Sequence, residues 1–319
     1  MFNASAVLSH PSAAESNVSP PHRLIPWISD EALAVVMPVA AYWIYSITFH
    51  FIMKAEIPFF EKYRIHTLEE METKNKVSLY EVLRMVLVQQ VLQTILGIMV
   101  LPSEQPALNN QVAQQIYAQR IQHWLQVIFA WKATIFTGAE TIQWMAYLSY
   151  WVIVPATQFV MAMFILDTHQ YFLHRLFHVN QFLYKHVHSH HHRLYVTYAF
   201  GALYNHPIEG FLLDSVGASM AFSLSGMSPR MGLLFFTFSS LKTVDDHCGY
   251  AFPWDPLQFL FGNNVVYHDI HHQQFGIKTN YSQPFFICWD RWLGTIVSDE
   301  AVKKYEDRRA KLRSAGKTN

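Results

Sequence analysis

The chain has 319 residues, of which 51% are hydrophobic and only 14% are charged, against about 25% charged residues in soluble domains. This deficit argues against a water-soluble protein and indicates one that is embedded in a membrane. The formal net charge is zero, which excludes the basic surface of a nucleic-acid-binding protein, so we expect no nucleic-acid partner. Two cysteines, Cys248 and Cys288, are too few for a disulfide framework or a thiolate metal site.

Residues 1–30 are polar and rich in Ser, Pro and Ala, without the basic start and apolar core of a cleavable signal peptide. We interpret them as a flexible N-terminal tail, and residues 31–166 as transmembrane helices with one interfacial helix. A membrane-crossing helix needs roughly 20 apolar residues. Three runs meet this length: Glu31 to Met53, Val82 to Leu101 and Trp144 to Leu166. A shorter amphipathic segment, Ile121 to Phe136, is the expected interfacial helix.

A fourth apolar region, Phe211 to Leu241, is interrupted at Ser225 to Arg230 by a glycine and a proline that mark a turn. It predicts two helical arms, a second membrane hairpin over 208–243 that either crosses the membrane or re-enters it. The expected fold is therefore an all-α integral membrane protein with about four transmembrane helices in two hairpins. A helical cap on the cytoplasmic face would hold the chemical site.

The distribution of basic residues predicts the orientation. The loop from Lys54 to Glu81 contains five Lys and Arg residues, whereas the loop from Pro102 to Gln143 contains two. Because basic loops stay on the cytoplasmic side, the first loop is expected there and the N-terminus in the lumen. Three crossings then place everything after Leu166 on the cytoplasmic face, including the basic C-terminal tail at 299–319.

Histidine is the unusual residue type, with 18 copies, thirteen of them between His169 and His272. Eight occur in one HxxxH and two HxxHH motifs: His174, His178, His188, His191, His192, His268, His271 and His272. Residues three and four apart share a helix face, so each motif can present its imidazoles to one site. Neutral imidazole is a common metal ligand, and one ion takes about four to six ligands. The motifs therefore predict two adjacent metal ions, with these eight residues as the catalytic and metal-ligating set.

Two single histidines between the motifs, His206 and His247, are further candidate ligands, with a helix cap or a partner of a ligand as the alternative. The remaining histidines are interpreted as ordinary: His10, His22, His50, His66, His123, His169, His186 and His190. Four carboxylates beside the motifs either accept the free N–H of a ligand imidazole or are ordinary acids: Asp167, Asp245, Asp246 and Asp269. Seven aromatic residues either line an apolar substrate channel or pack in the core: Phe172, Phe177, Tyr198, Phe200, Tyr204, Tyr281 and Phe285.

The three motifs resemble the membrane fatty acid hydroxylase/sterol desaturase superfamily, whose pattern is HxxxH, HxxHH and a second HxxHH. The peptides at 167–174, 199–210, 242–249 and 267–273 are similar to those of its sphinganine C4-hydroxylase branch. The resemblance covers roughly 155–296, so residues 167–298 are expected to form the catalytic region, with the hairpin at 208–243 inside it.

The resemblance implies a multi-pass enzyme of the endoplasmic reticulum membrane with its active site facing the cytoplasm. It implies a di-iron (Fe²⁺) monooxygenase that uses O2 to convert sphinganine or dihydroceramide to phytosphingosine-type products. The motif histidines would hold the iron, with His206 and His247 as the extra ligands that relatives place between the HxxHH motifs. Zinc can occupy the same imidazoles in a purified sample.

Electrons would come from NADH or NADPH through cytochrome b5 and its reductase. The sequence has no heme-binding His-Pro-Gly-Gly, so the donor is expected to be a separate protein. The alternatives are a C4-methyl sterol oxidase, a sterol C5-desaturase or an aldehyde-processing member of the superfamily. A histidine-rich metal transporter would place ionisable residues within the spans, whereas these clusters follow the span ends.

Overall fold

The structure is a computed structural model that describes residues 18–19, 23–100, 107–129 and 138–315. Within these ranges it is helical apart from one short antiparallel pair, β1 (Val18–Ser19) with β2 (Ala107–Leu108). The predicted all-α class is therefore confirmed. Backbone contacts divide the chain into two compact units, Met1–Leu33 with Leu101–Val160 and Ala34–Val100 with Met161–Asn319. The domain boundaries expected from the sequence stay predictions, and most of the N-terminal tail lies outside the described residues.

Three helical segments in the described part of the chain are long and apolar enough to cross a membrane. They are α2 (Asp30–Ala55), α5 (Leu79–Val100) and a continuous segment made of α8 (Ala139–Leu148), the π-helical η2 (Ser149–Ile153) and α9 (Val154–Val179). Large apolar side chains face outward along them, such as Ile44 at 69% exposure and Phe51 at 67%. Apolar surface of this extent is suited to lipid and not to water. The segments cover the three predicted spans apart from Leu101, which lies outside the described residues, and they indicate a multi-pass membrane protein.

The predicted hairpin forms, but neither arm qualifies as a membrane span. The first arm consists of α11 (Pro207–Gly210), the π-helical η5 (Phe211–Val216) and α12 (Gly217–Ser225), and the second is α13 (Pro229–Asp246). Gly226 joins them with φ +66°, a left-handed conformation that glycine adopts without strain. Four charged side chains make α13 too polar to span: Arg230, Lys242, Asp245 and Asp246. The described residues thus hold three candidate spans, where the sequence predicted about four.

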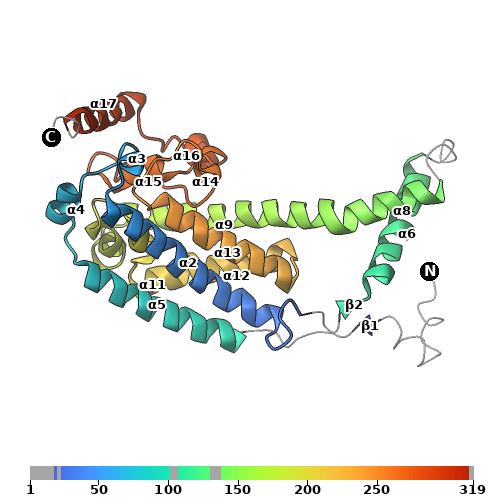
Figure 1. Cartoon of the computed structure of the whole chain (residues 1–319). Helices are drawn as coiled ribbons and strands as arrows, with labels where there is room; N and C mark the ends of the chain where they lie inside the picture. The colour runs from blue at the N-terminus through green and yellow to red at the C-terminus, as the bar shows by residue number, and fades with distance from the viewer. Residues whose placement is uncertain (1–17, 20–22, 101–106, 130–137, 316–319) are drawn as a thin grey trace. The chain divides into compact units, whose positions relative to one another are not determined.

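In the second unit, α2, α5 and α13 run alongside one another (Figure 1). Hydrogen bonds between polar side chains and neighbouring helices connect α2 to α5 and to α13. Trp43 on α2 donates a hydrogen bond to Gln90 on α5 at 2.7 Å, and Ser240 on α13 donates to the carbonyl of Pro38 on α2 at 3.0 Å. Because few solvent molecules compete in a lipid-facing bundle, such bonds fix the register of the helices.

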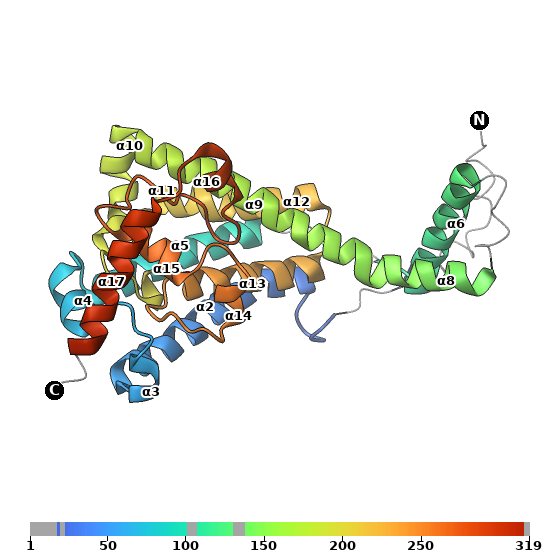
Figure 2. The ribbon, with the colours of Figure 1, turned by 90° about the horizontal axis from the view of Figure 1, so that it is seen from above.

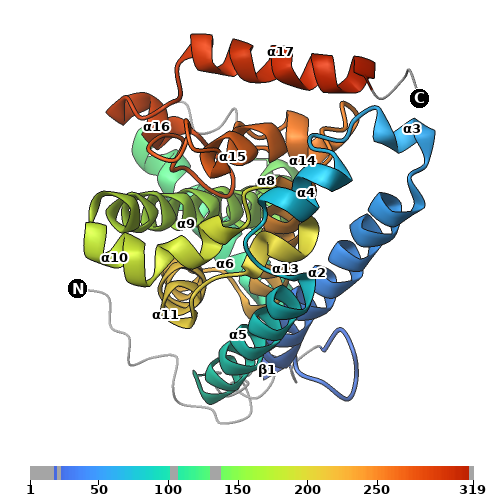
Figure 3. The same ribbon diagram turned by 90° about the vertical axis from the view of Figure 1, so that its left-hand side faces the viewer.

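Short helices gather at one end of α2 and α13 (Figures 1 and 3). They are α3 (Pro58–Glu61), α4 (Leu68–Lys74), α10 (Gln181–His186), α14 (Pro256–Phe259), α15 (Val265–His272) and α16 (Cys288–Leu293). Two 3₁₀ turns, η3 (His188–Arg193) and η4 (Ala199–Leu203), lie between α10 and the hairpin in the chain. This cap contains both HxxHH motifs, whereas the two histidines of the HxxxH motif, His174 and His178, lie on α9.

The predicted basic C-terminal tail forms a helix, α17 (Asp299–Ala315), which passes over α15 and α4 (Figure 2). Tyr305 anchors it, since its side chain is buried and its hydroxyl donates to the carboxylate of Asp269 on α15. The tail is thus part of the cap, and residues 316–319 lie outside the described ranges.

In the first unit, α6 (Asn110–Ile128) packs against α8 through three buried residues, Ala118, Ile142 and Ala146. The predicted interfacial helix at 121–136 overlaps the second half of α6, which begins earlier because Asn109 caps it by accepting the N–H of Gln111. Residues 130–136 lie outside the described residues, and the interfacial position stays a prediction.

Candidate metal centre

Five histidines form what we call the first histidine group. His174 and His178 come from α9, His188 and His192 from η3, and His271 from α15. Each offers one ring nitrogen, and these nitrogens all lie within 4.8 Å of one another. Nε2 of His188 lies 3.1 Å from Nε2 of His174 and 2.7 Å from Nε2 of His178.

Four histidines form the second histidine group: His191, His247, His268 and His272. His247 follows the last turn of α13, and its Nε2 lies 3.0 Å from Nε2 of His268. The sequence offered two single histidines between the motifs, His206 and His247, as further candidate ligands. The structure places His247 in the second group.

The two groups adjoin each other, because each HxxHH motif contributes histidines to both. In each motif the first and last histidines belong to one group and the middle one to the other. On α15, for example, His268 and His272 belong to the second group and His271 to the first. The centroids of the His192 and His272 rings, from different groups, are 4.9 Å apart. The spacing had predicted that each motif presents all its imidazoles to one site. The structure instead divides each HxxHH motif between two adjacent groups.

Hydrogen bonds fix which nitrogen faces inward in six of the nine rings. Five rings donate from Nδ1 to backbone carbonyl oxygens at 2.7–3.2 Å: His174, His191, His247, His271 and His272. His188 donates from Nδ1 to the carboxylate of Glu209 at 2.5 Å. A neutral imidazole protonated on Nδ1 has only a lone pair on Nε2. His174 and His188 therefore bring two lone pairs within 3.1 Å of each other, an arrangement that a cation between them would stabilise.

Burial keeps these rings neutral. Outside the membrane spans, it lowers the pKa of His191 to about 4 and the pKa values of His247 and His271 to about 3. Burial and the neighbouring rings lower the pKa values of four others well below the usual value: His188, His192, His268 and His272. Neutral imidazole is the form that binds metals, and an all-nitrogen donor set suits iron, zinc or copper. Nε2 of His271 is buried without a hydrogen-bond partner among the described residues, which also fits a metal.

The partners that orient the grouped histidine rings are carbonyl groups and Glu209, not the four carboxylates beside the motifs. Asp167 accepts the backbone N–H groups of Phe285 and Phe286, which ties α9 to the segment after α15. Asp246 pairs with Lys242, and Asp245 accepts from Gln258. The four acids thus brace the elements that hold the histidines. Glu209 was not singled out from the sequence, because its partner lies 21 residues away in another element.

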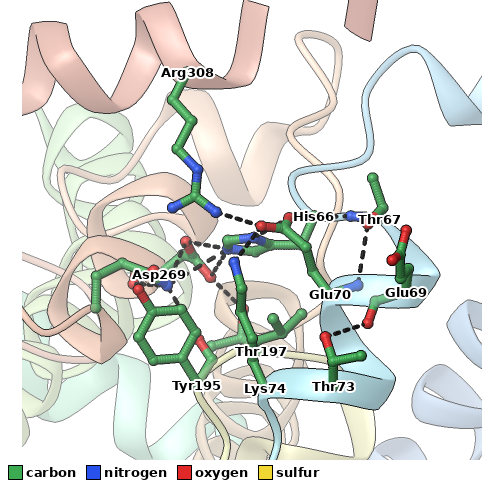
Figure 4. Close-up of polar contacts among 12 residues, drawn as sticks. His66, Thr67, Glu69, Glu70, Thr73, Lys74, Tyr195, Thr197, Asp269 and Arg308 are labelled. Atoms are coloured by element: carbon green, nitrogen blue, oxygen red, sulfur yellow. Dashed lines mark hydrogen bonds and ion pairs between the residues drawn. The ribbon is translucent and has the colours of Figure 1, made fainter. Parts of the chain in front are cut away.

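The fourth acid, Asp269, lies between two motif histidines on α15 and belongs to a separate polar network (Figure 4). Its carboxylate accepts hydrogen bonds from Nε2 of His66 at 2.9 Å, from Thr197 at 3.1 Å and from Tyr305. Nδ1 of His66 lies 3.0 Å from Glu70, which also pairs with Lys74 and Arg308.

His66 is held in its charged form within this network. Burial lowers its pKa, but the charge of Asp269 and the hydrogen bonds to Asp269 and Glu70 outweigh it and raise the pKa to about 9. The sequence had assigned His66 no role, and its partner Asp269 is 203 residues away. The network fastens the third histidine motif to α4 and α17.

Other histidines lie outside both groups. His206 caps α11, because its Nδ1 accepts the N–H of Ile208 at 3.3 Å. His169 contacts the carbonyl of Leu212 at 2.8 Å, which joins α9 to the hairpin. His190 contacts the carbonyl of Val187, and its ring packs on that of His206.

The seven aromatic residues named from the sequence divide between the histidine groups and the core. The Tyr281 ring centroid lies 5.2 Å from that of His178, and the Phe177 ring packs on His188. Phe172 is half-exposed beside Trp289. The others are buried in the packing of the cap and bundle: Tyr198, Phe200, Tyr204 and Phe285. The burial of these four fits the core-packing alternative.

Comparisons with known proteins agree with this arrangement. A model of the fatty acid hydroxylase family matches residues 159–295. The chain is 44% identical to a sphingolipid C4-hydroxylase of Schizosaccharomyces pombe over 90% of this chain and 95% of that protein. It is 44% identical to a sphinganine C4-monooxygenase of Arabidopsis thaliana over 88% and 92% of the two chains. It is also 42% identical to a very-long-chain aldehyde decarbonylase of Oryza sativa over 89% and 96%.

No solved structure matches the chain significantly. The relatives match over nearly their whole length, and the matched family region contains every residue of both histidine groups. The chain therefore belongs to the fatty acid hydroxylase family.

Proposed function

We propose that the chain is a sphingolipid C4-hydroxylase that acts on sphinganine or dihydroceramide and gives phytosphingosine-type products. The observation that carries this proposal is the similarity to sphingolipid C4-hydroxylases along almost the entire chain. The two adjoining histidine groups support it, because insertion of oxygen into an unactivated C–H bond needs a metal that the side chains cannot replace.

The nine grouped histidines are the proposed ligands, with the first group holding one ion and the second group the other. His247 completes the set, whereas the geometry favours a capping role for His206. When bound, the two ions, iron by analogy with the family, would supply the activation of O2. The chain's own residues orient the ligand rings, through Glu209 and the carbonyls, and exclude water by burying them.

The overall reaction transfers one oxygen atom of O2 into a C4–H bond of the lipid. The second oxygen atom leaves as water, which consumes two protons and two electrons. By analogy with the family, these electrons are proposed to come from NADH or NADPH through cytochrome b5. We place the protein in the endoplasmic reticulum membrane with the cap on the cytoplasmic side. An electron donor that faces the cytoplasm would then reach the histidine groups. The basic loop at 54–81 supports this orientation.

The proposal is tested in yeast that lacks its own C4-hydroxylase, with phytosphingosine measured by mass spectrometry. Wild-type protein should restore the product, and His271→Ala should not. His190→Ala is the matched control, because His190 lies on η3 beside the ligands but outside both groups. Absence of product from a membrane-inserted, metal-loaded wild-type protein would contradict the sphingolipid assignment.

One second candidate has a specific observation in its favour. The similarity to the aldehyde decarbonylase of Oryza sativa is nearly as high and covers the chain as fully. The same yeast strain, supplied with a very-long-chain aldehyde, separates the two. Hydrocarbon without phytosphingosine would favour the decarbonylase, and phytosphingosine with no hydrocarbon would favour the hydroxylase. Sterol profiles of the strain test the sterol-oxidase and sterol-desaturase alternatives.

A further inference from the structure

A small polar cavity lies on the hairpin side of the histidine groups. Its walls include ligands of both groups, His188, His191, His247 and His268, together with Glu209 and Asn263. Its free volume is about 30 Å³, against the roughly 10–15 Å³ that one water molecule needs. The cavity therefore has room for a hydroxyl group or for one or two water molecules.

Two oxygen atoms of the lining residues have no hydrogen-bond donor among the described residues. The first is Oδ1 of Asn263, whose side chain is fully buried. Its amide is held in place because Nδ2 donates to Asp246 at 2.9 Å and to the carbonyl of Pro284 at 3.1 Å, so the oxygen is the free end. The second is Oε2 of Glu209, whose other oxygen accepts from His188. Buried acceptors normally have partners, so the cavity is built for a small ligand that donates hydrogen bonds.

The proposed substrates carry such a group beside the carbon that is oxidised. In sphinganine and in dihydroceramide, C3 bears a hydroxyl, and its oxygen is only two bonds from C4. When C4 lies at the metals, the C3 hydroxyl must lie among the residues that touch the ligand histidines. Oxidation in the middle of an alkyl chain would leave these buried acceptors unpaired, because methylene groups would lie on both sides of the reacting carbon.

We infer that this cavity binds the C3 hydroxyl of the sphingoid substrate, with Oδ1 of Asn263 accepting its single O–H. The inference rests on the proposed function and adds the specificity determinant to it. Before substrate binds, a water molecule can fill the cavity, and the hydroxyl that replaces it keeps the hydrogen bond to Asn263. The hydroxyl then sets which methylene faces the metals, so C4 is oxidised instead of its neighbours.

The test compares sphinganine, 3-deoxysphinganine and 1-deoxysphinganine with the metal-loaded full-length wild-type protein. We expect kcat/KM to fall by about 10- to 100-fold when the C3 hydroxyl is removed, because a buried acceptor then loses its donor. Removal of the C1 hydroxyl should cost less than about threefold. Sphinganine should also raise the apparent unfolding temperature of the protein more than 3-deoxysphinganine does. Equal kcat/KM values for sphinganine and 3-deoxysphinganine, or a larger loss for the 1-deoxy analogue, would overturn the inference.

A substitution completes the test as a double cycle. Asn263→Ala should lower kcat/KM about 10- to 100-fold for sphinganine but less than about threefold for 3-deoxysphinganine. An equal loss for both substrates would overturn the inference, since it would indicate general damage. Asn110→Ala, the same change at an exposed position on α6 outside the cavity, is the control, and metal content per chain is measured for each variant. If Asn263→Ala does not fold, Asn263→Ser takes its place, and the comparison of analogues needs no variant. Failure of the proposed function is distinguishable, because wild-type protein would then give no product from sphinganine at all.

Discussion

The two histidine groups have the same chemistry but different access to solvent. All four residues of the second group are buried, with at most 5% of any side chain exposed: His191, His247, His268 and His272. The first group includes two partly exposed residues, His178 and His192. The second group takes His247 from the end of α13 and so lies against the bundle, whereas the first is built from residues of α9, η3 and α15.

One repeated motif can thus contribute to two sites that differ in burial. An ion in the second group is enclosed by packed elements and can leave only if they separate. An ion in the first group has a partly open side, which is the side where exchange with solvent and approach of an electron donor are possible.

Removal of one ligand from each group should abolish activity but affect folding unequally. We expect His272→Ala and His178→Ala each to lower the rate on the order of 10³-fold, because the chemistry requires both ions. Metal analysis should give about one ion per chain instead of two in each variant. His272→Ala should lower the apparent unfolding temperature more, because it leaves a buried gap and an unpaired carbonyl at Leu194. A larger loss of stability in His178→Ala would contradict the contrast between the groups.

Chelation should remove the two ions in two phases. We expect the ion of the first group to leave at least about tenfold faster, because His178 and His192 are partly exposed. Timed metal analysis of the wild-type protein with a soluble chelator measures both phases, and activity should disappear with the first. Zinc added afterwards should refill that site without restoring activity. Loss of both ions in a single phase would show that the groups open together.

The sequence predicted the main elements of the fold and most of the grouped histidines for local reasons. Spans are recognisable because crossing lipid requires a continuous apolar run, and the hairpin turn because Gly226 and Pro229 interrupt one. Pairs four residues apart, such as His268 and His272, lie in the same group because one helical turn separates them.

The rest depends on contacts between distant segments, which spacing cannot show. The choice of His247 over His206 is made by the packing of α13, and the partner of His188 by the position of Glu209 on α11. His66 was overlooked because nothing near it in the chain points to Asp269. The structure has three candidate spans in its described residues instead of about four, because the charged end of α13 packs in the cap and makes this helix too polar to cross a membrane.

The His66 network predicts a pH effect on folding that should be common to both groups, because α15 carries ligands of each. The folded pKa of about 9 lies above the ordinary 6.5, so the protonated ring stabilises the fold fully below pH 6.5 and loses this effect as pH rises to 9. The difference corresponds to on the order of 3 kcal/mol. The groups that face the ring are Asp269 and Glu70, and Glu70 stays ionised across this range because the hydrogen bond from His66 lowers its pKa.

The measurement is the apparent unfolding temperature of wild type and His66→Gln at pH 6, 7.5 and 9. The two curves should differ most at pH 6 and converge near pH 9, because Gln cannot carry the charge. Thr73→Ala on the exposed face of α4 serves as a control for disturbance of that helix. Parallel curves for wild type and His66→Gln would mean that the ring is neutral in the folded protein.

The smallest effect on metal content and stability is expected from substitution of His206. This substitution tests whether a histidine near the motifs in sequence must also be a metal ligand. The His206 ring caps α11 and lies in neither group, so His206→Ala should change metal content by less than about twofold and cost about 1 kcal/mol of stability through the lost cap. His247→Ala, by contrast, should lose the ion of the second group. Metal analysis of both variants makes the comparison directly. If His206→Ala lost an ion, the loop between η4 and α11 would have to move toward the histidines on metal binding, and the enclosed second group would be a property of the metal-free fold alone.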